Sequence, residues 1–227
     1  MSKNIKKLKN KYQGEDIWLL LAGSSVDYID KSFFENKITI GQNHMFKLFP
    51  CNYIVMKDCM EEPRFPRAIK QCNELNIPLL YSEYYGGKLS DQKNIVEHDN
   101  SYVFSHNPRK PSIWLKDELP NLKEDDIITS RSTVTTLMHI ACYMGAKNII
   151  LCGHDCGTIN GNLYAEGYTE SDWKSANNWN GINTFLNKSQ NDSILVRDYL
   201  KEKYNVNIYS INPFLNLGLE NNEFKPC

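Results

Sequence analysis

The stretch "ITSRSTVTTLMHIACYMGAKNIILCGHDCG", residues 128–157, decides the fold of this chain. In its first half, apolar side chains from Val134 onward follow the i, i+3, i+4, i+7 and i+8 spacing of one face of an amphipathic helix, which ends at Gly145. Its second half contains "NIILCG" at 148–153, a short apolar run typical of a buried parallel strand. A helix followed directly by such a strand predicts an α/β sheet.

The same alternation of apolar strands and helical segments runs through most of the chain. Because strand–helix–strand units cross over with right-handed connections, they predict an α/β fold: a single Rossmann-like domain over 1–227 with a doubly wound, mainly parallel sheet. Two polar regions, 83–126 and 157–192, are expected to lie over the sheet edge, and the second is a candidate lid-like insertion because it directly follows a central strand. The expected strands are 16–23, 37–43, 51–58, 77–82, 148–153 and 206–212, and the expected helices are 62–76, 133–145 and 193–205.

Composition excludes several classes of protein. The 227 residues carry 26 basic and 27 acidic side chains, a net charge of −1, which gives no electrostatic reason to expect nucleic acid or an anionic membrane as a partner. The longest apolar run, 17–22, is too short to span a bilayer, and the basic N-terminus is predicted to be a solvated start rather than a signal peptide. Seven scattered cysteines do not form a disulfide pattern, so we expect a reduced, cytoplasmic protein.

Small or polar residues follow almost every predicted strand. Ligands of open α/β sheets bind beyond the carboxyl ends of the strands, so these residues are candidates for a binding site. Each residue alone also has a structural interpretation, such as a tight turn at Gly23 or a helix cap at Asn43 and Asp58. The candidate positions are Gly23, Ser24, Ser25, Asn43, Asp58, Thr129, Ser130, Arg131, Ser132, Gly153 and Asp155.

Three hydroxyl side chains and an arginine precede the helix expected to begin near residue 133. Helix capping explains one of the hydroxyl groups. Taken together, Thr129, Ser130, Arg131 and Ser132 are also suited to bind an anion at the positive end of the helix dipole.

The tripeptide Gly153-His154-Asp155 has three interpretations. In the first, Asp155 caps the following segment and His154 is a structural histidine. In the second, Cys152, His154 and Cys156 bind a metal, although their spacing is not that of a CxxC knuckle. In the third, Asp155 is a ligand-binding acid at the end of the strand. The chain contains neither a GxGxxG motif nor a Walker A sequence, so ordinary dinucleotide and P-loop sites are excluded, and a nucleophile elbow is also absent.

The order of the segments "LLLAGSS", "TIGQN", "YIVMKD", "ITSRSTVTTLMHIACYMGAKNIILCGHD", "LYAE" and "YLKEKYNVNIYSINP" resembles the core of the bacterial sialyltransferases of glycosyltransferase family 42. It is similar also to the motility accessory factor and 6-hydroxymethylpterin diphosphokinase (MptE-like) group. The resemblance covers roughly 16–60 and 127–213. It implies a Rossmann-like fold that binds CMP-sialic acid without a metal. The first loop, "AGSSVD", departs from the usual "GNGPSL" or "GPSL", and Arg131 stands where the sialyltransferases commonly have glycine.

The resemblance also implies roles for individual residues. Tyr164, in "NGNLYAE", aligns with a family tyrosine that hydrogen-bonds the departing phosphate. The resemblance implies that the donor phosphate lies near Gly23, Ser24 and Ser25, and that the nucleotide and donor sugar lie near Asn43 and Asp58. It also implies that Thr129 and Ser130 bind the donor, and that Gly153 and Asp155 bind the cytidine ribose.

The resemblance does not identify the general base directly. The sialyltransferases use a histidine in the lid, but residues 157–192 contain no histidine. In a loose alignment, the position of the family's histidine falls near Lys188. This lysine would need a depressed pKa to serve as a base. His154 is a second candidate, since an imidazole that titrates near neutrality suits proton removal from a hydroxyl.

These observations predict a glycosyltransferase-like transferase that uses a nucleotide-activated sugar, a CMP-activated nonulosonic acid, to modify a surface glycan or glycoprotein. The expected partners are this donor and a glycan or protein acceptor, with a homo-oligomer as one option and no cofactor. One alternative is an MptE-like diphosphokinase that uses ATP and Mg²⁺ held by carboxylates such as Asp155 and Asp58. Another is a non-catalytic nucleotide-binding protein of the same fold.

Overall fold

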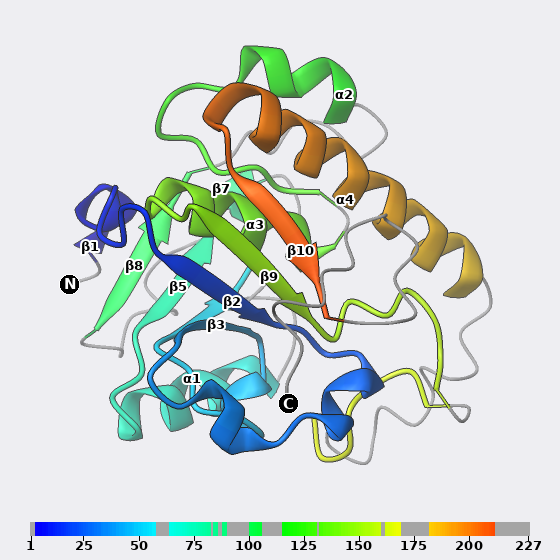
Figure 1. Ribbon diagram of the computed structural model, residues 1–227. Helices are drawn as coiled ribbons and strands as arrows, with labels where there is room; N and C mark the ends of the chain where they lie inside the picture. Colours follow the sequence, from blue (N-terminus) through cyan, green and yellow to red (C-terminus); the bar gives the residue numbers. More distant parts are fainter. Residues whose placement is uncertain are drawn as a thin grey trace.

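The computed structural model describes residues 3–57, 64–82, 84–85, 88–89, 100–105, 115–130, 132–159, 162–168 and 182–211. Within these residues, eight parallel strands form one sheet in the order β1-β8-β5-β4-β3-β2-β9-β10 (Figure 1). The strands are β1 (Lys3–Asn4), β2 (Asp16–Leu20), β3 (Ile38–Gln42), β4 (Tyr53–Met56), β5 (Leu79–Ser82), β8 (Ser101–Phe104), β9 (Asn148–Cys152) and β10 (Asn207–Ser210). A separate antiparallel pair consists of β6 (Tyr84–Tyr85) and β7 (Lys88–Leu89).

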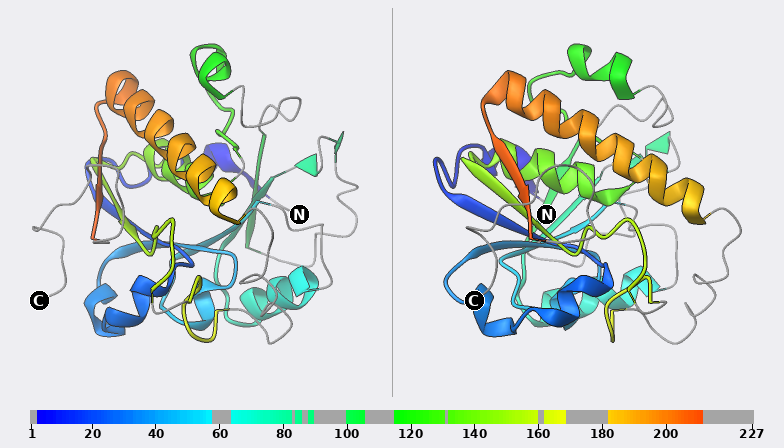
Figure 2. Two further views of the ribbon diagram at one scale, coloured as in Figure 1. Left: turned by 90° about the vertical axis from the view of Figure 1, so that its right-hand side faces the viewer. Right: turned by 45° about the vertical axis from the view of Figure 1, so that its right-hand side comes forward.

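The chain winds in two directions from β2. On one side of β2 lie β3, β4, β5, β8 and β1, and on the other side lie β9 and β10. Helix α1 covers one face of the sheet, and α3 and α4 cover the other (Figure 2). The predicted doubly wound α/β fold is therefore confirmed, with its topological switch point between β2 and β9. The helices are α1 (Arg64–Glu74), α2 (Leu115–Glu118), α3 (Thr133–Tyr143) and α4 (Ile182–Tyr204), with 3-10 helices η1 (Ile5–Leu8), η2 (Ser24–Tyr28), η3 (Lys31–Phe34), η4 (Met45–Lys47) and η7 (Leu119–Asn121).

Strand β2 shows why both faces of the sheet are covered. Ile17 and Leu19 pack in the apolar cluster that includes α3, whereas Trp18 and Leu20 pack in the cluster on the opposite face. Successive side chains of a strand point to opposite faces, so a strand that is apolar at successive positions needs a covering layer on each side.

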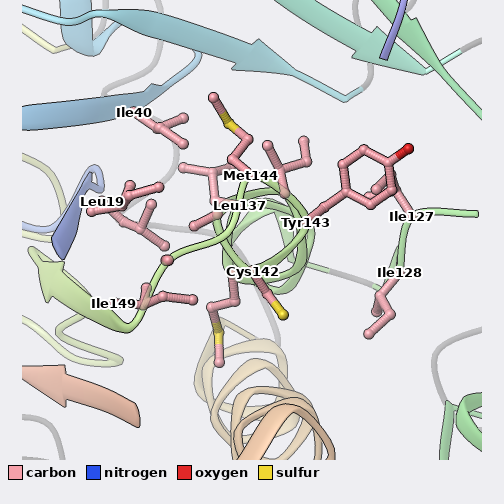
Figure 3. Packing of buried hydrophobic residues seen from close by; sticks show 14 of the residues in the cluster. Leu19, Ile40, Ile127, Ile128, Leu137, Cys142, Tyr143, Met144 and Ile149 are labelled. Carbon is pink, nitrogen blue, oxygen red and sulfur yellow. The ribbon is translucent and has the colours of Figure 1, made fainter. Parts of the chain in front are cut away.

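Helix α3 is buried on every side, which corrects the prediction of a helix with a single apolar face. All 11 of its residues are buried. The sheet covers one side and α4 the other: in Figure 3, Leu137 lies toward Leu19 and Ile40 of the sheet, and Cys142 lies toward α4. The apolar spacing thus marked only part of the buried surface, because a second helix layer cannot be inferred from the helix that it covers.

The sheet extends further than the sequence predicted. Strand β8 lies inside 83–126, predicted as a polar excursion over the sheet edge, and pairs with β5 and β1. Strand β1 belongs to the N-terminus predicted as a solvated start, where Ile5 and Leu8 are also buried in the core. Both strands are short and partly polar, so pairing with a neighbour rather than local periodicity stabilises them.

Helix α4 begins at Ile182, whereas the prediction placed its start at 193 and assigned the preceding residues to a lid-like insertion. Residues 182–192 are therefore helical, and residues 162–168 pack against the loop after β2. Residues 169–181 of the predicted lid lie outside the described residues. The first turns of α4 are rich in Asn, Ser, Thr and Asp, which have low helix propensity and are common in loops.

The described cysteines are Cys51, Cys72, Cys142, Cys152 and Cys156, and all are free thiols. Burial raises the pKa of Cys72, Cys142 and Cys156 to about 12, so these thiols are protonated at neutral pH. In the part of the chain that the structure describes, every helix is too short or too polar to cross a lipid bilayer.

His139 fixes the turn that precedes α3. Its Nδ1 accepts a hydrogen bond from Ile128 N at 2.9 Å. Complete burial lowers the pKa of His139 to about 3, so the ring is neutral at pH 7 and Nδ1 remains an acceptor.

We predict that the free energy of unfolding falls as the pH is lowered below about 6.5, the pKa of histidine in an unfolded chain. Because the folded-state pKa of His139 is lower, the unfolded state binds the proton first, and stability is lost progressively as the pH falls toward 3. The slope from one such group is at most about 1.4 kcal/mol per pH unit. Urea denaturation at several pH values measures this slope.

His139→Asn is the informative variant, because the amide oxygen can replace Nδ1 as an acceptor and does not titrate. It should reduce the pH dependence without abolishing it, since burial also lowers the pKa of His154 to about 4. Equal slopes for the variant and the wild type would contradict the assignment of the pH dependence to His139.

Candidate functional site

The two central strands, β2 and β9, end side by side at the switch point, and a glycine follows each of them. Gly23 N donates a hydrogen bond to Gly153 O at 2.9 Å. A Cβ on Gly153 would lie 2.5 Å from Leu21 O, and a Cβ on Gly23 would lie 2.5 Å from Gly153 O. Only glycine permits the two backbones to approach so closely. Both predicted glycines therefore lie at the centre of the sheet edge where ligands of this fold class bind.

The carboxylate of Asp155 lies at this switch point and is held by the loop that follows β2. Ser25 N donates a hydrogen bond to Asp155 Oδ2 at 2.8 Å, and Ser25 Oγ donates one to Oδ1 at 2.5 Å. Asp155 is 4% exposed, so these bonds offset part of the free-energy cost of burying its charge. Carboxylate oxygens accept hydrogen bonds from N–H and O–H donors. The arrangement is therefore suited to accept hydroxyl groups from a ligand.

Residues 162–168 fold back onto the same loop. Ser24 Oγ donates a hydrogen bond to Asn162 O at 2.8 Å, and Tyr164 pairs with Gly23 in an antiparallel bridge. The structure thus brings Tyr164 to the switch point, beside the predicted glycine. The hydroxyl protons of Ser24 and Ser25 are both used within the protein, and the predicted contact of this loop with a phosphate stays a prediction.

The ring of Tyr168 lies next to two other aromatic rings. The ring centroid of Tyr168 is 5.7 Å from that of Tyr164 and 5.9 Å from that of His44. Asn43 was a predicted site residue, and its backbone adopts the left-handed conformation that asparagine tolerates (φ 48°). Its neighbour His44 was not among the predicted site residues. The position of His44 directly after the Asn43 turn was the available signal, because both residues follow the carboxyl end of β3.

Lys57 is a second polar residue at this edge of the sheet that was not among the predicted site residues. It directly follows β4, is 8% exposed, and donates a hydrogen bond from Nζ to Ser130 O at 2.8 Å. This contact joins the end of β4 to the turn before α3. The sequence prediction selected the next residue, Asp58, which lies outside the described residues.

Among the hydroxyl groups before α3, that of Ser130 is bonded within the protein. Ser130 Oγ lies 2.9 Å from Thr135 Oγ1 and accepts a hydrogen bond from Ser132 N at 3.3 Å. Within the described residues, Ser132 precedes α3 without a side-chain capping hydrogen bond, and Thr129 is half-buried. Arg131 lies outside the described residues. The predicted anion site at Thr129, Ser130 and Ser132 is therefore a polar turn whose ligand contacts remain a prediction.

His154, one of the two candidate bases, is buried against α4. Its Nε2 lies 2.9 Å from Ser193 Oγ, and Ser193 Oγ donates a hydrogen bond to Ser189 O at 2.9 Å. Because a hydroxyl has a single proton, His154 Nε2–H is the donor to Ser193. Burial lowers the pKa of His154 to about 4. At neutral pH this imidazole is a weak proton acceptor, and its predicted catalytic role stays a prediction.

The metal-binding interpretation of Cys152, His154 and Cys156 is wrong. Cys156 Sγ lies 3.7 Å from His154 Nε2 and 3.8 Å from Nδ1, distances of a weak hydrogen bond. Among the residues that the structure describes, no group of three or more His, Cys, Asp and Glu side chains is arranged to hold a metal ion.

Lys188, the other candidate base, lies on α4. Its side chain is exposed, whereas Ser189 and Ser193 on the same helix are buried. The structure therefore separates Lys188 from the face of α4 that contacts His154, and its catalytic role stays a prediction.

Comparison with known proteins gives matches in structure alone, since no family model and no curated protein sequence matches this chain. The sialyltransferase CST-II in complex with a trisaccharide acceptor and CMP is similar with a TM-score of 0.53 and 15% identity, over 94% of this chain and 89% of that chain. CstII from Campylobacter jejuni in complex with a substrate analogue, cytidine-5'-monophosphate, gives a TM-score of 0.54 and 16% identity, over 92% and 88%. At these identities the likeness establishes a shared fold.

We predict that Gly23→Ala destabilises the protein and displaces the Asp155 carboxylate. The added Cβ would lie 2.5 Å from Asp155 Cγ and from Gly153 O, and backbone cannot move away as a flexible side chain can. Overpacking of this kind costs about 1–3 kcal/mol of unfolding free energy, measurable by urea denaturation.

Gly157→Ala is the matched control in the same loop region. A Cβ there would meet only Asp155 O, at 3.7 Å, so its effect should stay within about 0.5 kcal/mol. Equal stabilities for the two variants would show that the close approach at Gly23 does not constrain the site.

Proposed function

We propose that this protein is a glycosyltransferase that transfers a nucleotide-activated sugar, a CMP-activated nonulosonic acid, to a glycan or glycoprotein acceptor. The proposal draws support from the fold that the chain shares with a sialyltransferase crystallised with CMP. The observation that carries it is the buried Asp155 carboxylate, which Ser25 holds at the switch point between β2 and β9.

A ribose presents two adjacent hydroxyl groups, and a fixed carboxylate is a matched acceptor for both. In the proposed complex, the nucleoside lies at the switch point, next to the loops that begin at Gly23 and Gly153. In this complex the Asp155 carboxylate accepts hydrogen bonds from the ribose hydroxyls. Ser25 keeps the carboxylate in position, so little reorganisation is needed when the nucleotide binds.

The phosphate of the donor would then lie on the side of Tyr164. A phenol donates a hydrogen bond that strengthens as negative charge develops on the leaving phosphate, and this lowers the barrier to transfer. Other polar residues at the same edge complete the proposed donor site. These are Ser24, Asn43, Thr129, Ser130 and Ser132, with Asp58 and Arg131 assigned from sequence alone.

We propose further that no resident metal takes part, because the developing charge on a single phosphate can be stabilised by hydrogen-bond donors such as Tyr164. We propose that the enzyme is cytoplasmic and takes part in the modification of surface glycans or glycoproteins. A homo-oligomer is the proposed form of assembly.

We predict that CMP or CDP raises the melting temperature without added metal. A ligand at a hundredfold excess over its Kd stabilises by about 2.7 kcal/mol, a shift of roughly 5–10 °C for a chain of this size. A panel of CMP, CDP, UDP, GDP and ATP, each with and without Mg²⁺, measures this. Asp155→Ala should remove the response to CMP while the variant still unfolds cooperatively.

Stabilisation by ATP only in the presence of Mg²⁺ would instead support the diphosphokinase alternative. A panel without any response would leave the proposed donor site without support.

We also predict that Tyr164→Phe lowers kcat by roughly 10²–10³ with little change in the affinity for CMP. The substitution keeps the ring against Tyr168 and removes only the phenolic donor. Release of CMP from CMP-sialic acid measures kcat, and titration with CMP measures the affinity.

Tyr28→Phe serves as the control, because Tyr28 is 70% exposed and lies at the far end of η2. It should leave kcat unchanged. A wild-type kcat in Tyr164→Phe would make Tyr164 a packing residue.

A further inference from the structure

The buried face of α4 changes from apolar to polar along the helix. Val196 and Leu200 are fully buried and belong to the apolar core. Toward the N-terminus, the same face continues with Ser193, Asp192 and Ser189, which are 0%, 7% and 4% exposed. The spacing of these residues is that of one side of a helix, so the polar and apolar halves form one continuous buried stripe.

The polar half of this stripe lies at the carboxyl ends of the strands. Helix α4 leads into β10, which is parallel to β9, and in Figure 1 it runs beside β10 in the opposite direction. Its N-terminal half is therefore on the side of the switch point. The contact between Ser193 Oγ and His154 Nε2 at 2.9 Å confirms this placement, because His154 follows the end of β9.

Burial of polar groups at this level has an energetic cost that apolar residues would avoid. Ser189 Oγ is buried and has no hydrogen-bond partner in the described part of the chain. Asp192 adds a buried carboxylate one turn further along the helix. Three polar side chains on the buried face at the site, directly before an apolar continuation, are not explained by packing of the core and point to a role in the site.

We propose that Asp192 is the general base of the transfer reaction and that the polar face of α4, formed by Ser189, Asp192 and Ser193, binds the acceptor hydroxyl group. This inference rests on the proposed function. The acceptor oxygen forms the new glycosidic bond to the donor sugar, and the bond between that sugar and the phosphate breaks. The phosphate leaves with the electron pair, and the acceptor proton moves to the Asp192 carboxylate.

The two bases predicted from sequence are less suited to this step. Lys188 is on the exposed side of α4. His154 already donates Nε2–H to Ser193, and its Nδ1 is next to the Cys156 thiol. His154 instead positions Ser193, and through it the polar face of α4. Asp192 is the carboxylate of this face, and a carboxylate has lone pairs to accept a proton.

The test measures CMP release from CMP-sialic acid, with water or lactose as the hydroxyl acceptor, in the full-length protein. Asp192→Asn, which keeps the shape and removes the base, should lower kcat by about 10²–10⁴ and leave the Kd for CMP unchanged. Asp192→Ala should regain part of its rate when formate is added, because a small carboxylate can occupy the space and accept the proton. A merely structural carboxylate would show no such recovery.

Asp198→Asn is the matched control, since Asp198 is an exposed carboxylate on the same helix, and it should keep the wild-type kcat. A wild-type kcat in Asp192→Asn, or an Asp192→Ala variant that formate does not restore, would overturn the assignment. If Asp192→Asn fails to fold, the formate experiment on Asp192→Ala decides, and misfolding of both variants would make Asp192 structural. A wild-type protein that neither binds CMP nor releases it would count against the proposed function itself.

Discussion

The hydrogen bond from Gly23 N to Gly153 O joins the ends of the two central strands at the edge where the chain changes its direction of winding. Neither glycine has space for a Cβ, so the two loops leave the sheet from almost the same point. This constraint brings Ser25 of the first loop against Asp155 of the second, 130 residues away in sequence. The polar centre of the site is thus a consequence of how closely two backbones approach.

A second consequence follows from the burial of α3. Because α3 lies between the sheet and α4, the outer helix must be long enough to cover it and to reach the strand ends. Helix α4 meets this requirement with 23 residues. Its buried face is apolar where it packs on the core, at Val196 and Leu200, and polar where it reaches the site, at Ser193. Burial of polar side chains there stabilises the fold less than burial of apolar side chains would. Residues that reduce stability in this way are expected at functional sites.

The likeness to a sialyltransferase at 15–16% identity concerns the arrangement of the backbone. The same fold class supports many reactions, so the chemistry of this chain must be derived from its own side chains. The region 157–192 contains no histidine, and His154 is neutral and hydrogen-bonded to Ser193. Under the proposed function, the base would be set by which groups of α4 face the strand ends, a property of helix packing rather than of a motif.

Local sequence determined much of the fold and the location of the candidate site. Apolar runs such as 16–23 and 148–153 predicted buried parallel strands, because a strand covered on both faces is apolar at successive positions. The same runs placed Gly23, Gly153 and Asp155 at strand ends, where ligands of this fold class bind. These inferences depend only on periodicity and on position relative to a strand, which the sequence displays directly.

Tertiary structure alone decided the pairings. Strands β1 and β8 form because each pairs with a neighbour, and the first turns of α4 are helical where their polar sequence resembles a loop. The partnership of Ser25 with Asp155 and the contact of Lys57 with Ser130 also join segments far apart in the chain. Their free energies come from burial and from hydrogen bonds between distant residues, and no local pattern encodes which distant residue will be the partner.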